Sequence, residues 1–430
     1  MSEIGDLDRI MESLSSVEPE WVSAVRREAL IRFRDTVLEL PVDSPTTRHY
    51  TPVDNRELDS YNFMKRRRSE RGRPRCETGE NCLIEWDTVT QSISLDRQST
   101  SEGVVLAPFD EETFASYGNI IKRWLFKFLD PFEDRFAMMN AGFWSGGVFI
   151  HVPDGVEVTL PIHLLRRIKV PGYAEVTRNM LIAGKGSKVR VFEDIVGLEC
   201  ETLRNDVFEV VAGEGADVEF LTLQDIGTKM KRVSRYRARV EKGASIRWFP
   251  VVFGSDWSIC RVESTLAGAG ASNETYGGFL GYGEERIDLG NNTFHLSPKT
   301  SNRIFTRGIM MGRSSSVFRG GIEIHILAKG STSQMKQETL ILSREARANS
   351  IPSLTIRTNE VQARHAASVY QIDESQIYYL MSRGVSRAEA VSLMVNGFFM
   401  PIIERITIGK FRNRIEEKIA WGVNHGKIQV

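Results

Sequence analysis

The stretch AGKGSKVRVFEDI, residues 183–195, decides the fold, because it joins a tight corner of small residues to a run rich in Val, Ile and Phe. The same pattern returns in AGEGADVEFLTLQDI at 212–226 and in VEKGASIRWF at 240–249. Related corners are LAGAGAS, GRSSSV, AKGSTS and SREARA, which begin at residues 266, 312, 328 and 343. A corner that recurs before each strand indicates one repeated supersecondary unit.

The spacing of the corners predicts how the units stack. Aligned on positions 186, 215, 243, 270, 314, 330 and 345, they are 29, 28, 27, 44, 16 and 15 residues apart. Most spacings are near a unit of roughly 14 to 15 residues or twice that, which is typical of stacked coils. A larger Cβ at each corner would hold neighbouring coils apart. We therefore predict a right-handed parallel β-helix, with an antiparallel sandwich as the rival architecture.

The chain divides into three predicted regions around this core. Residues 1–110 form an N-terminal helical region with an irregular basic segment, residues 111–370 the β-helix core and residues 371–430 a C-terminal helical domain. Apolar residues at helical spacing predict two short helices within residues 1–40. The basic segment KRRRSERGRPR, residues 65–75, is more typical of a solvated loop than of a nucleic-acid arm, because no aromatic residues interleave with it.

The C-terminal region carries clear signals for helix ends. Asp373, three residues before Gln376, predicts a helix start with a capping box, and Ser386 repeats the pattern for a second helix. Gly384 is expected to end the first helix, and Pro401 is expected at the end of the second. The tail from Ile402 to Ile419 is also predicted to be helical.

Composition restricts the kind of partner. The 430 residues include 56 Lys and Arg and 56 Asp and Glu, so no net charge attracts nucleic acid or an anionic membrane. The N-terminus lacks the pattern of a secretory signal, and we expect a soluble cytoplasmic protein. Four scattered cysteines fit a reducing compartment without a disulfide framework. Cys76 and Cys82 are also too far apart in sequence for a usual zinc knuckle.

Common catalytic motifs are missing from the sequence. No G-x-x-x-x-G-K-[ST], G-x-S-x-G or H-E-x-x-H run occurs, so ATP hydrolysis would have to come from a partner, and we expect no enzyme activity. Two alternatives stay open. One is a carbohydrate-active β-helix enzyme with a carboxylate pair, for which Asp217, Asp225 and Asp288 are candidates. The other is a passive structural β-helix that only self-associates.

Three segments carry a resemblance to a known family. They are HAASVYQIDESQIYYLMSRGVSRAEAVSLMVNGFFMPIIE at 365–404, FRGGIEIHILAKGSTSQMKQETLILSREARANSIPSLTI at 318–356 and NAGFWSGGVFIHVPDGVEVTLPIHL at 140–164. They resemble the SufB/SufD family of iron-sulfur cluster assembly scaffold proteins. The resemblance spans about residues 140–405.

The resemblance implies a scaffold subunit that pairs through its β-helix with a SufB-type paralogue or with itself. It also implies docking of a SufC-type ABC ATPase on the C-terminal helices, with a sulfur donor and apo iron-sulfur proteins as indirect partners. His365 matches the family histidine proposed to contribute to a nascent cluster at the dimer interface, and its imidazole is a reasonable iron ligand. No tightly bound cofactor is implied, only a transient iron-sulfur cluster.

Two departures from the SufB pattern favour a SufD-like or undifferentiated member. Ile356 stands where SufB-type chains have a cysteine, and Ala366 where they have a glutamate. For docking of the ATPase, the candidates are Tyr378, Tyr379, Arg383, Gly384 and Phe398. Their aromatic and Arg side chains are expected to be partly exposed, because such groups are enriched among interface anchors. Glu360 is expected to be solvated or ion-paired.

Overall fold

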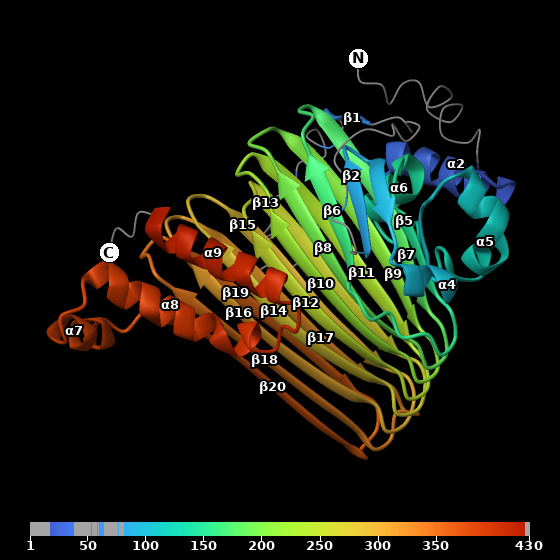
Figure 1. Cartoon of the computed structure of the whole chain (residues 1–430). Coiled ribbons are helices and arrows are strands. Elements are labelled where there is room, and N and C mark those ends of the chain that lie inside the picture. The colour runs from blue at the N-terminus through green and yellow to red at the C-terminus, as the bar shows by residue number, and fades with distance from the viewer. Residues whose placement is uncertain are drawn as a thin grey trace.

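Two ten-stranded sheets face each other along the molecule (Figure 1). The computed structural model describes residues 18–37, 53, 58, 60–63, 76 and 81–425. From residue 162 onward, successive strands alternate between the sheets, and every pair of neighbouring strands there is parallel. Each coil therefore adds one strand to each sheet, which confirms the predicted parallel β-helix.

We call the two sheets the odd sheet and the even sheet. The odd sheet contains β1 (Asn62–Phe63), β4 (Val105–Pro108), β5 (Val148–Val152), β7 (Tyr173–Ala183), β9 (Thr202–Ala212), β11 (Met230–Val240), β13 (Trp257–Leu266), β15 (Arg286–His295), β17 (Ser315–Ile324) and β19 (Arg347–Ile356). The even sheet contains β2 (Asn81–Trp86), β3 (Val89–Ser94), β6 (Ile162–Ile168), β8 (Lys188–Gly197), β10 (Asp217–Asp225), β12 (Ser245–Phe253), β14 (Ser272–Gly281), β16 (Ser301–Met310), β18 (Ser331–Ile341) and β20 (Val361–Gln371).

Helices cover both ends of the chain. The N-terminal helices are α2 (Glu20–Asp35), α4 (Arg97–Ser101), α5 (Glu111–Trp124) and α6 (Arg135–Phe143), and the C-terminal ones are α7 (Glu374–Ser382), α8 (Arg387–Ile403) and α9 (Gly409–His425). The α2 helix confirms the second helix expected within residues 1–40; the first, and the basic segment at 65–75, lie outside the described residues. No helix in the described part of the chain has the length and apolar character needed to cross a membrane.

The predicted corners belong to two rows, one at each side of the sheets. Positive φ angles mark the row that leads into the even sheet: Gly186 (65°), Gly215 (69°), Gly243 (65°), Gly270 (72°), Lys299 (57°) and Gly330 (73°). The corners aligned at 314 and 345 lead into β17 and β19 of the odd sheet and so belong to the opposite row. The 44-residue spacing therefore crosses from one row to the other.

The expected reason for glycine at these corners is only partly right. A Cβ at Gly186 or Gly243 would meet no atom within 4 Å, so their positive φ, which most L-residues avoid, explains glycine there. Close contact between neighbouring coils explains the glycine at an earlier position of the corner. A Cβ at Gly213 would lie 2.8 Å from the carbonyl oxygen of Ala183 in the preceding coil.

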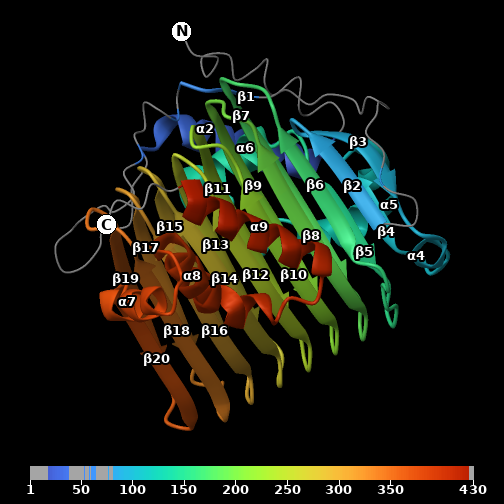
Figure 2. The ribbon, with the colours of Figure 1, turned by 60° about the vertical axis from the view of Figure 1, so that its left-hand side comes forward.

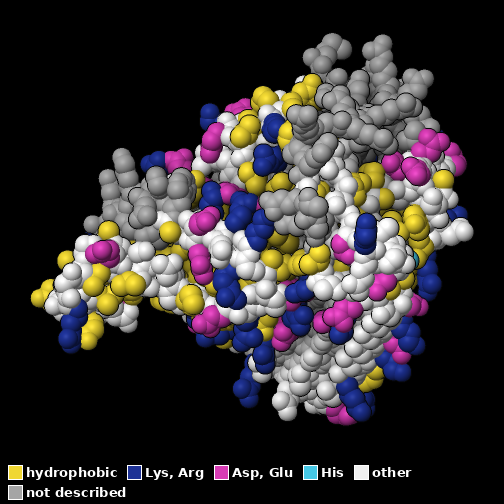
Figure 3. All heavy atoms as spheres, viewed as in Figure 1, with side chains coloured by type: hydrophobic (Ala, Val, Ile, Leu, Met, Phe, Trp, Pro, Cys, Tyr) yellow, Lys and Arg dark blue, Asp and Glu magenta, His cyan; other side chains and the backbone are white. Residues whose placement is uncertain are grey.

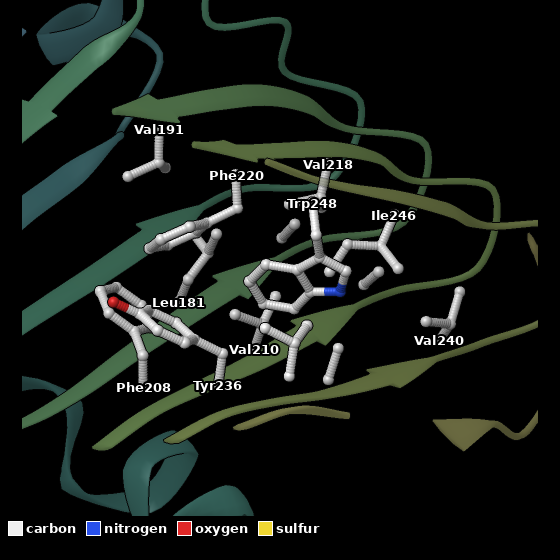
Figure 4. Packing of buried hydrophobic residues seen from close by; sticks show 14 of the residues in the cluster. Leu181, Val191, Phe208, Val210, Val218, Phe220, Tyr236, Val240, Ile246 and Trp248 are labelled. Carbon is white, nitrogen blue, oxygen red and sulfur yellow. The ribbon is translucent and has the colours of Figure 1, made fainter. Parts of the chain in front are cut away.

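Buried apolar side chains fill the space between the sheets. In Figure 4, Phe208, Phe220, Tyr236 and Trp248 come from four strands and pack together. The ring centroids of Phe208 and Phe220 are 4.6 Å apart in an edge-to-face arrangement, which favours aromatic pairs beyond the burial of their area. This packing forms the continuous core along the coils.

A buried ionic network ties the sheets together in the first coils. Arg204 of the odd sheet donates to Asp206 over 2.6 Å and to Glu85 of the even sheet over 3.1 Å. Arg232 donates to Asp206 over 2.8 Å, and Arg166 likewise donates to Glu85 over 2.8 Å. Burial alone would raise the pKa of Asp206, but Arg204 and Arg232 outweigh it and hold this pKa well below its usual range.

One cysteine expectation is wrong. Cys76 and Cys82 form a disulfide, with their Cα atoms 5.9 Å apart. This separation lies within the range of about 4.4 to 6.8 Å that a disulfide requires, a closeness that their spacing in sequence did not reveal. The other two cysteines are unpaired, and Cys260 is buried in strand β13 as expected.

Candidate functional site

The last coil leaves the β-helix with two unpaired strand edges. Among the described strands, β19 pairs only with β17, and β20 pairs only with β18. Figure 2 shows both strands at the end of the coil stack, with no described segment beyond them. The backbone donors and acceptors along such edges are able to pair with another chain.

Side chains that point between the sheets are exposed in this coil. Leu354 pairs in register with Ile322, and Ile356 with Ile324. The two residues of β17 are buried at 2% and 0% exposure, whereas Leu354 and Ile356 are 42% and 43% exposed. Inward-facing apolar side chains thus become surface only because no further coil follows.

His365 lies on this inward face. It pairs in register with Met335, which is 3% exposed and belongs to the interior core. Paired residues of parallel strands point to the same side, so the imidazole also faces the space between the sheets. Its Nε2 is buried without a hydrogen-bond partner, and burial lowers the pKa of His365 from its usual value. A neutral ring nitrogen is thereby left able to bind a ligand.

The register also separates His365 from the position of the missing cysteine. Across the interior, Met335 faces Gly320, because a Cβ on that glycine would lie 2.2 Å from the Met335 sulfur. Gly320 pairs with Pro352, so Pro352 is opposite His365. Ile356 is four residues further along β19, about 13 Å at the usual rise of a strand. Within one chain, a side chain at Ile356 is therefore displaced along the sheet from the imidazole.

Metal ligands do not gather around His365 within the chain. Among the described residues, no group of three or more His, Cys, Asp or Glu side chains is placed to hold a metal ion. Glu360 instead pairs with Lys329, with 2.8 Å between its carboxylate and the amine, as expected for a surface carboxylate. A metal site that used His365 would need further ligands from another molecule.

The C-terminal helices begin and end largely as the sequence predicts. Asp373 caps α7 by accepting from the Ser375 amide over 2.8 Å, but the capping box predicted with Gln376 is not formed. Ser386 forms a complete capping box with Glu389 at the start of α8. The expectation for Pro401 is wrong, because α8 continues through it to Ile403. Proline lacks an amide hydrogen, so α8 loses the hydrogen bond to the Gly397 carbonyl in its last turn.

Helices α8 and α9 lie across the outer face of the even sheet (Figure 2). Phe411 of α9 packs edge-to-face on Phe192, with ring centroids 4.8 Å apart. Lys418 of α9 is 2.7 Å from Asp225, which fixes the helix to β10. Apolar side chains from both helices and from the sheet form one buried cluster. These two helices are therefore part of the folded core rather than an appended module.

Helix α7 and one side of α8 present apolar side chains to solvent. Tyr378 is 74% exposed and Tyr379 is 58% exposed. Leu393 of α8 is 54% exposed, and the guanidinium of Arg383 lies 5.3 Å from the Tyr379 ring centroid. Figure 3 shows hydrophobic side chains on the surface at this protruding end of the molecule. We call Tyr378, Tyr379, Arg383 and Leu393 the α7–α8 surface set.

Two further candidates have structural roles. Phe398 was expected to be partly exposed, and this is wrong: it is 8% exposed and packs edge-to-face on Tyr370 at 6.1 Å. The guanidinium of Arg307 lies over the Phe398 ring, 4.6 Å from its centroid. Gly384 follows α7 with φ of 89°, a left-handed conformation that favours glycine at a helix end.

A groove of about 870 Å³ lies on the outer face of the even sheet, beside the end of α8. Its lining includes the aromatic residues Tyr276 and Phe305 and four cations, Arg303, Lys336, Arg364 and Arg405. His365 borders the groove, but strand alternation directs its side chain to the opposite face of β20.

Sequence reasoning missed this groove. Three of its four cations, Arg303, Lys336 and Arg364, come from strands and lie about thirty positions apart in sequence, so they become neighbours only through strand register. The signal that was available is the recurrence of a basic residue within RIF at 303–305, MKQ at 335–337 and ARH at 363–365.

The carboxylates proposed for a sugar-cleaving site do not converge. Asp288 lies on the odd sheet beside Arg261 at 2.8 Å, whereas Asp225 lies on the even sheet beside α9. Asp217 accepts from Ser245 near a corner. Asp217 and Asp225 stand at the two ends of β10, and Asp288 is on the other sheet, so no two of these carboxylates form an acid and base pair.

Comparison with known proteins identifies the family. Residues 167–398, more than half of the chain, match the family described as SUF system FeS cluster assembly, SufBD core domain. The chain is 26% identical over 425 residues to an iron-sulfur cluster assembly SufBD family protein of Staphylococcus saprophyticus, with 94% of this chain and 90% of that protein covered. Proteins of the same description from Staphylococcus haemolyticus and Staphylococcus aureus are 26% and 25% identical over 426 residues, with the same shares covered.

Fold and site together define a parallel β-helix with one open end and a helical module fixed to one of its sheets. The chain belongs to the SufBD family of iron-sulfur cluster assembly proteins.

Proposed function

We propose that this chain is a non-enzymatic scaffold subunit of a Suf iron-sulfur cluster assembly complex. In this proposal it pairs with a second β-helix, a SufB-type paralogue or another copy of itself, through the last coil. The observation that carries the proposal is the open end itself, where Leu354, Ile356 and Val369 are at least 40% exposed around His365. Exposed inward-facing apolar groups next to two bare strand edges suit burial by another chain.

His365 contributes one ligand to a transient cluster at that interface. Its unpartnered Nε2 and lowered pKa support this role, because iron binds the neutral imidazole. The remaining ligands come from the mate, since Ile356 occupies the matching cysteine position in this chain and lies displaced from the imidazole along the sheet. A cysteine-bearing paralogue supplies the missing chemistry most directly.

Anaerobic reconstitution tests the role of His365. The chain, together with its mate, is incubated with iron and sulfide, and visible absorption is recorded. His365→Ala is expected to lower the absorption of the assembled cluster to less than about half, because one ligand is lost. His325→Ala is the matched control, since His325 lies at a corner away from the last coil's interior. Equal absorption from the His365→Ala and His325→Ala complexes would contradict the ligand role.

The α7–α8 surface set docks a SufC-type ABC ATPase, which supplies the ATP hydrolysis that this sequence lacks. Support comes from the exposed tyrosines beside Arg383, a composition that is enriched at interface anchors. Deleting the helices would uncover the core of the even sheet, so point substitutions give the cleaner test. Tyr378→Ser with Tyr379→Ser is expected to weaken capture of the ATPase about tenfold or more.

Leu327→Ser provides the control for this capture experiment. Leu327 is also a strongly exposed apolar residue, at 64%, but it lies at the corner between β17 and β18. Its substitution should leave capture unchanged. If the double tyrosine variant captures the ATPase as well as Leu327→Ser does, the docking surface lies elsewhere.

A further inference from the structure

The groove beside the end of α8 combines flat aromatic side chains with positive charge that is only partly paired. Strand register places Tyr276, Phe305 and Lys336 in one row across β14, β16 and β18. The neighbouring row contains Arg303 and Arg364, separated by one strand. Adjacent strands lie about 4.8 Å apart, so the two rows form a continuous floor.

The charge of the groove is only partly balanced. Lys336 is 2.8 Å from Glu338, and Arg303 is 4.0 Å from Glu274. Arg364 has no ion-pair or hydrogen-bond partner among the described residues. No acidic residue is part of the groove's lining. The groove therefore favours an anion.

Arg405 completes the site from the connection between α8 and α9. Its guanidinium stacks 4.6 Å from the Tyr276 ring centroid and donates to the Tyr276 hydroxyl over 3.2 Å. These contacts fix the planar group, and no carboxylate in the described chain pairs with it. Pro401 lies beside it in the same wall. A cation held rigidly in this way loses little freedom when an anion binds.

We propose that this groove binds a small organic polyanion with a planar apolar part, whose acidic groups pair with Arg364, Lys336 and Arg405 while its flat part rests on Phe305. The volume of about 870 Å³ falls within the roughly 300 to 1,000 Å³ of small-molecule sites. The cavity opens on the outer face of the even sheet, opposite the face that carries the His365 side chain. The proposed anion site therefore does not use the His365 imidazole.

Titration calorimetry at low ionic strength tests the site on the full chain, with benzene-1,3,5-tricarboxylate as the probe. We expect saturable binding with one site per chain, weakened by added salt. Arg364→Gln and Lys336→Gln should each weaken binding about tenfold, because a charge-assisted hydrogen bond is lost. Since Arg364 has no partner within the described chain, its substitution is expected to leave the fold intact.

Controls separate this groove from general attraction to positive charge. Arg347→Gln, at an exposed cation of β19 in the odd sheet, should leave the dissociation constant unchanged. Pyrophosphate serves as a second probe without an apolar part, and Phe305→Leu should weaken binding of the tricarboxylate more than that of pyrophosphate. Absence of saturable tricarboxylate binding overturns the proposal, as does an equal dissociation constant for Arg364→Gln and Arg347→Gln.

Discussion

The two ends of the β-helix are built differently. At the first coils, β3 and β4 run antiparallel to their neighbours, and the ionic network around Arg204 joins the sheets. At the last coil, β19 and β20 are edge strands, and β20 carries His365. Short antiparallel strands blunt the first end against pairing with other chains. No described segment protects the last end in this way. The difference teaches that one end of this β-helix is finished within the chain, while the other has the properties of a surface that a second chain completes.

The interiors of the two ends also differ in their charged side chains. The first coils bury Arg166, Arg204 and Arg232 completely, each satisfied by carboxylates of the opposite or same sheet. Buried charges of this kind are costly unless every partner is present. The last coil contains only one ionisable inward group, His365, among small and apolar residues. The first end therefore depends on mutual pairing of its buried charges, whereas the interior of the last coil has no such network.

The largest expected effect comes from breaking the ionic network. Arg204→Met leaves Glu85, Asp206 and Glu175 short of one cationic partner each, and all three carboxylates are at most 2% exposed. We expect the free energy of unfolding to fall by about 3 to 5 kcal/mol, as for other broken buried ion pairs. Urea unfolding followed by circular dichroism measures it. The control Arg347→Met changes an exposed position of β19, and its free energy of unfolding should stay within about 0.5 kcal/mol of the unsubstituted protein. An equally small change for Arg204→Met would show that the ionic network contributes little to stability.

Phe398 tests whether the C-terminal helices belong to the core. Phe398→Ala removes a ring that packs on Tyr370 and under Arg307, so it should cost about 3 kcal/mol of unfolding free energy. Leu393→Ala, on an exposed side of the same helix, should cost no more than about 0.5 kcal/mol. Thermal and urea unfolding of both variants distinguish them. Equal stabilities would mean that α8 is held more loosely than its burial indicates.

The open end is tested by a charge on its inward face. Val369 is 40% exposed in this chain and becomes buried if a second β-helix continues the stack. Val369→Lys should weaken pairing with the mate about thirtyfold or more, because an unpaired charge would be buried at the interface. Light scattering after size exclusion records the dissociation. Thr332→Lys, on the outer face of β18, is the control, and equal pairing by the two variants would place the interface elsewhere.

Much of the fold could be predicted because corners and strand composition repeat along the chain. The division of the corners into two rows could not be predicted. Lys299 stands where the other corners of its row have glycine, so that corner does not show the small-residue pattern. Strand alternation predicts the face of β20 on which the His365 side chain lies. Its exposure depends on whether another coil follows, and the local sequence does not predict that. The groove joins Arg303 and Arg364 through register alone, and no short motif records such a contact.

The smallest expected effect is the pH dependence of stability that Glu175 causes. It tests the difference in buried charge between the two ends. Burial raises the pKa of this carboxyl well above its usual value, more than Arg204 lowers it, although its Oε2 accepts from Arg204 over 2.7 Å. Above about pH 4.3, where an unfolded glutamate loses its proton, the folded state binds more protons than the unfolded state. Stability contributed by this group therefore falls as pH rises.

Glu175→Gln removes that dependence, because an amide does not titrate. The stability of the variant relative to the parent should increase from pH 5 to pH 7 in urea unfolding. Asp206 does not obscure the trend, since its lowered pKa makes its contribution complete above about pH 3.9, the unfolded value. A difference between variant and parent that stays constant over this range would mean that Glu175 is ionised in the fold. The first coils would then hold one more negative charge than their buried arginines balance.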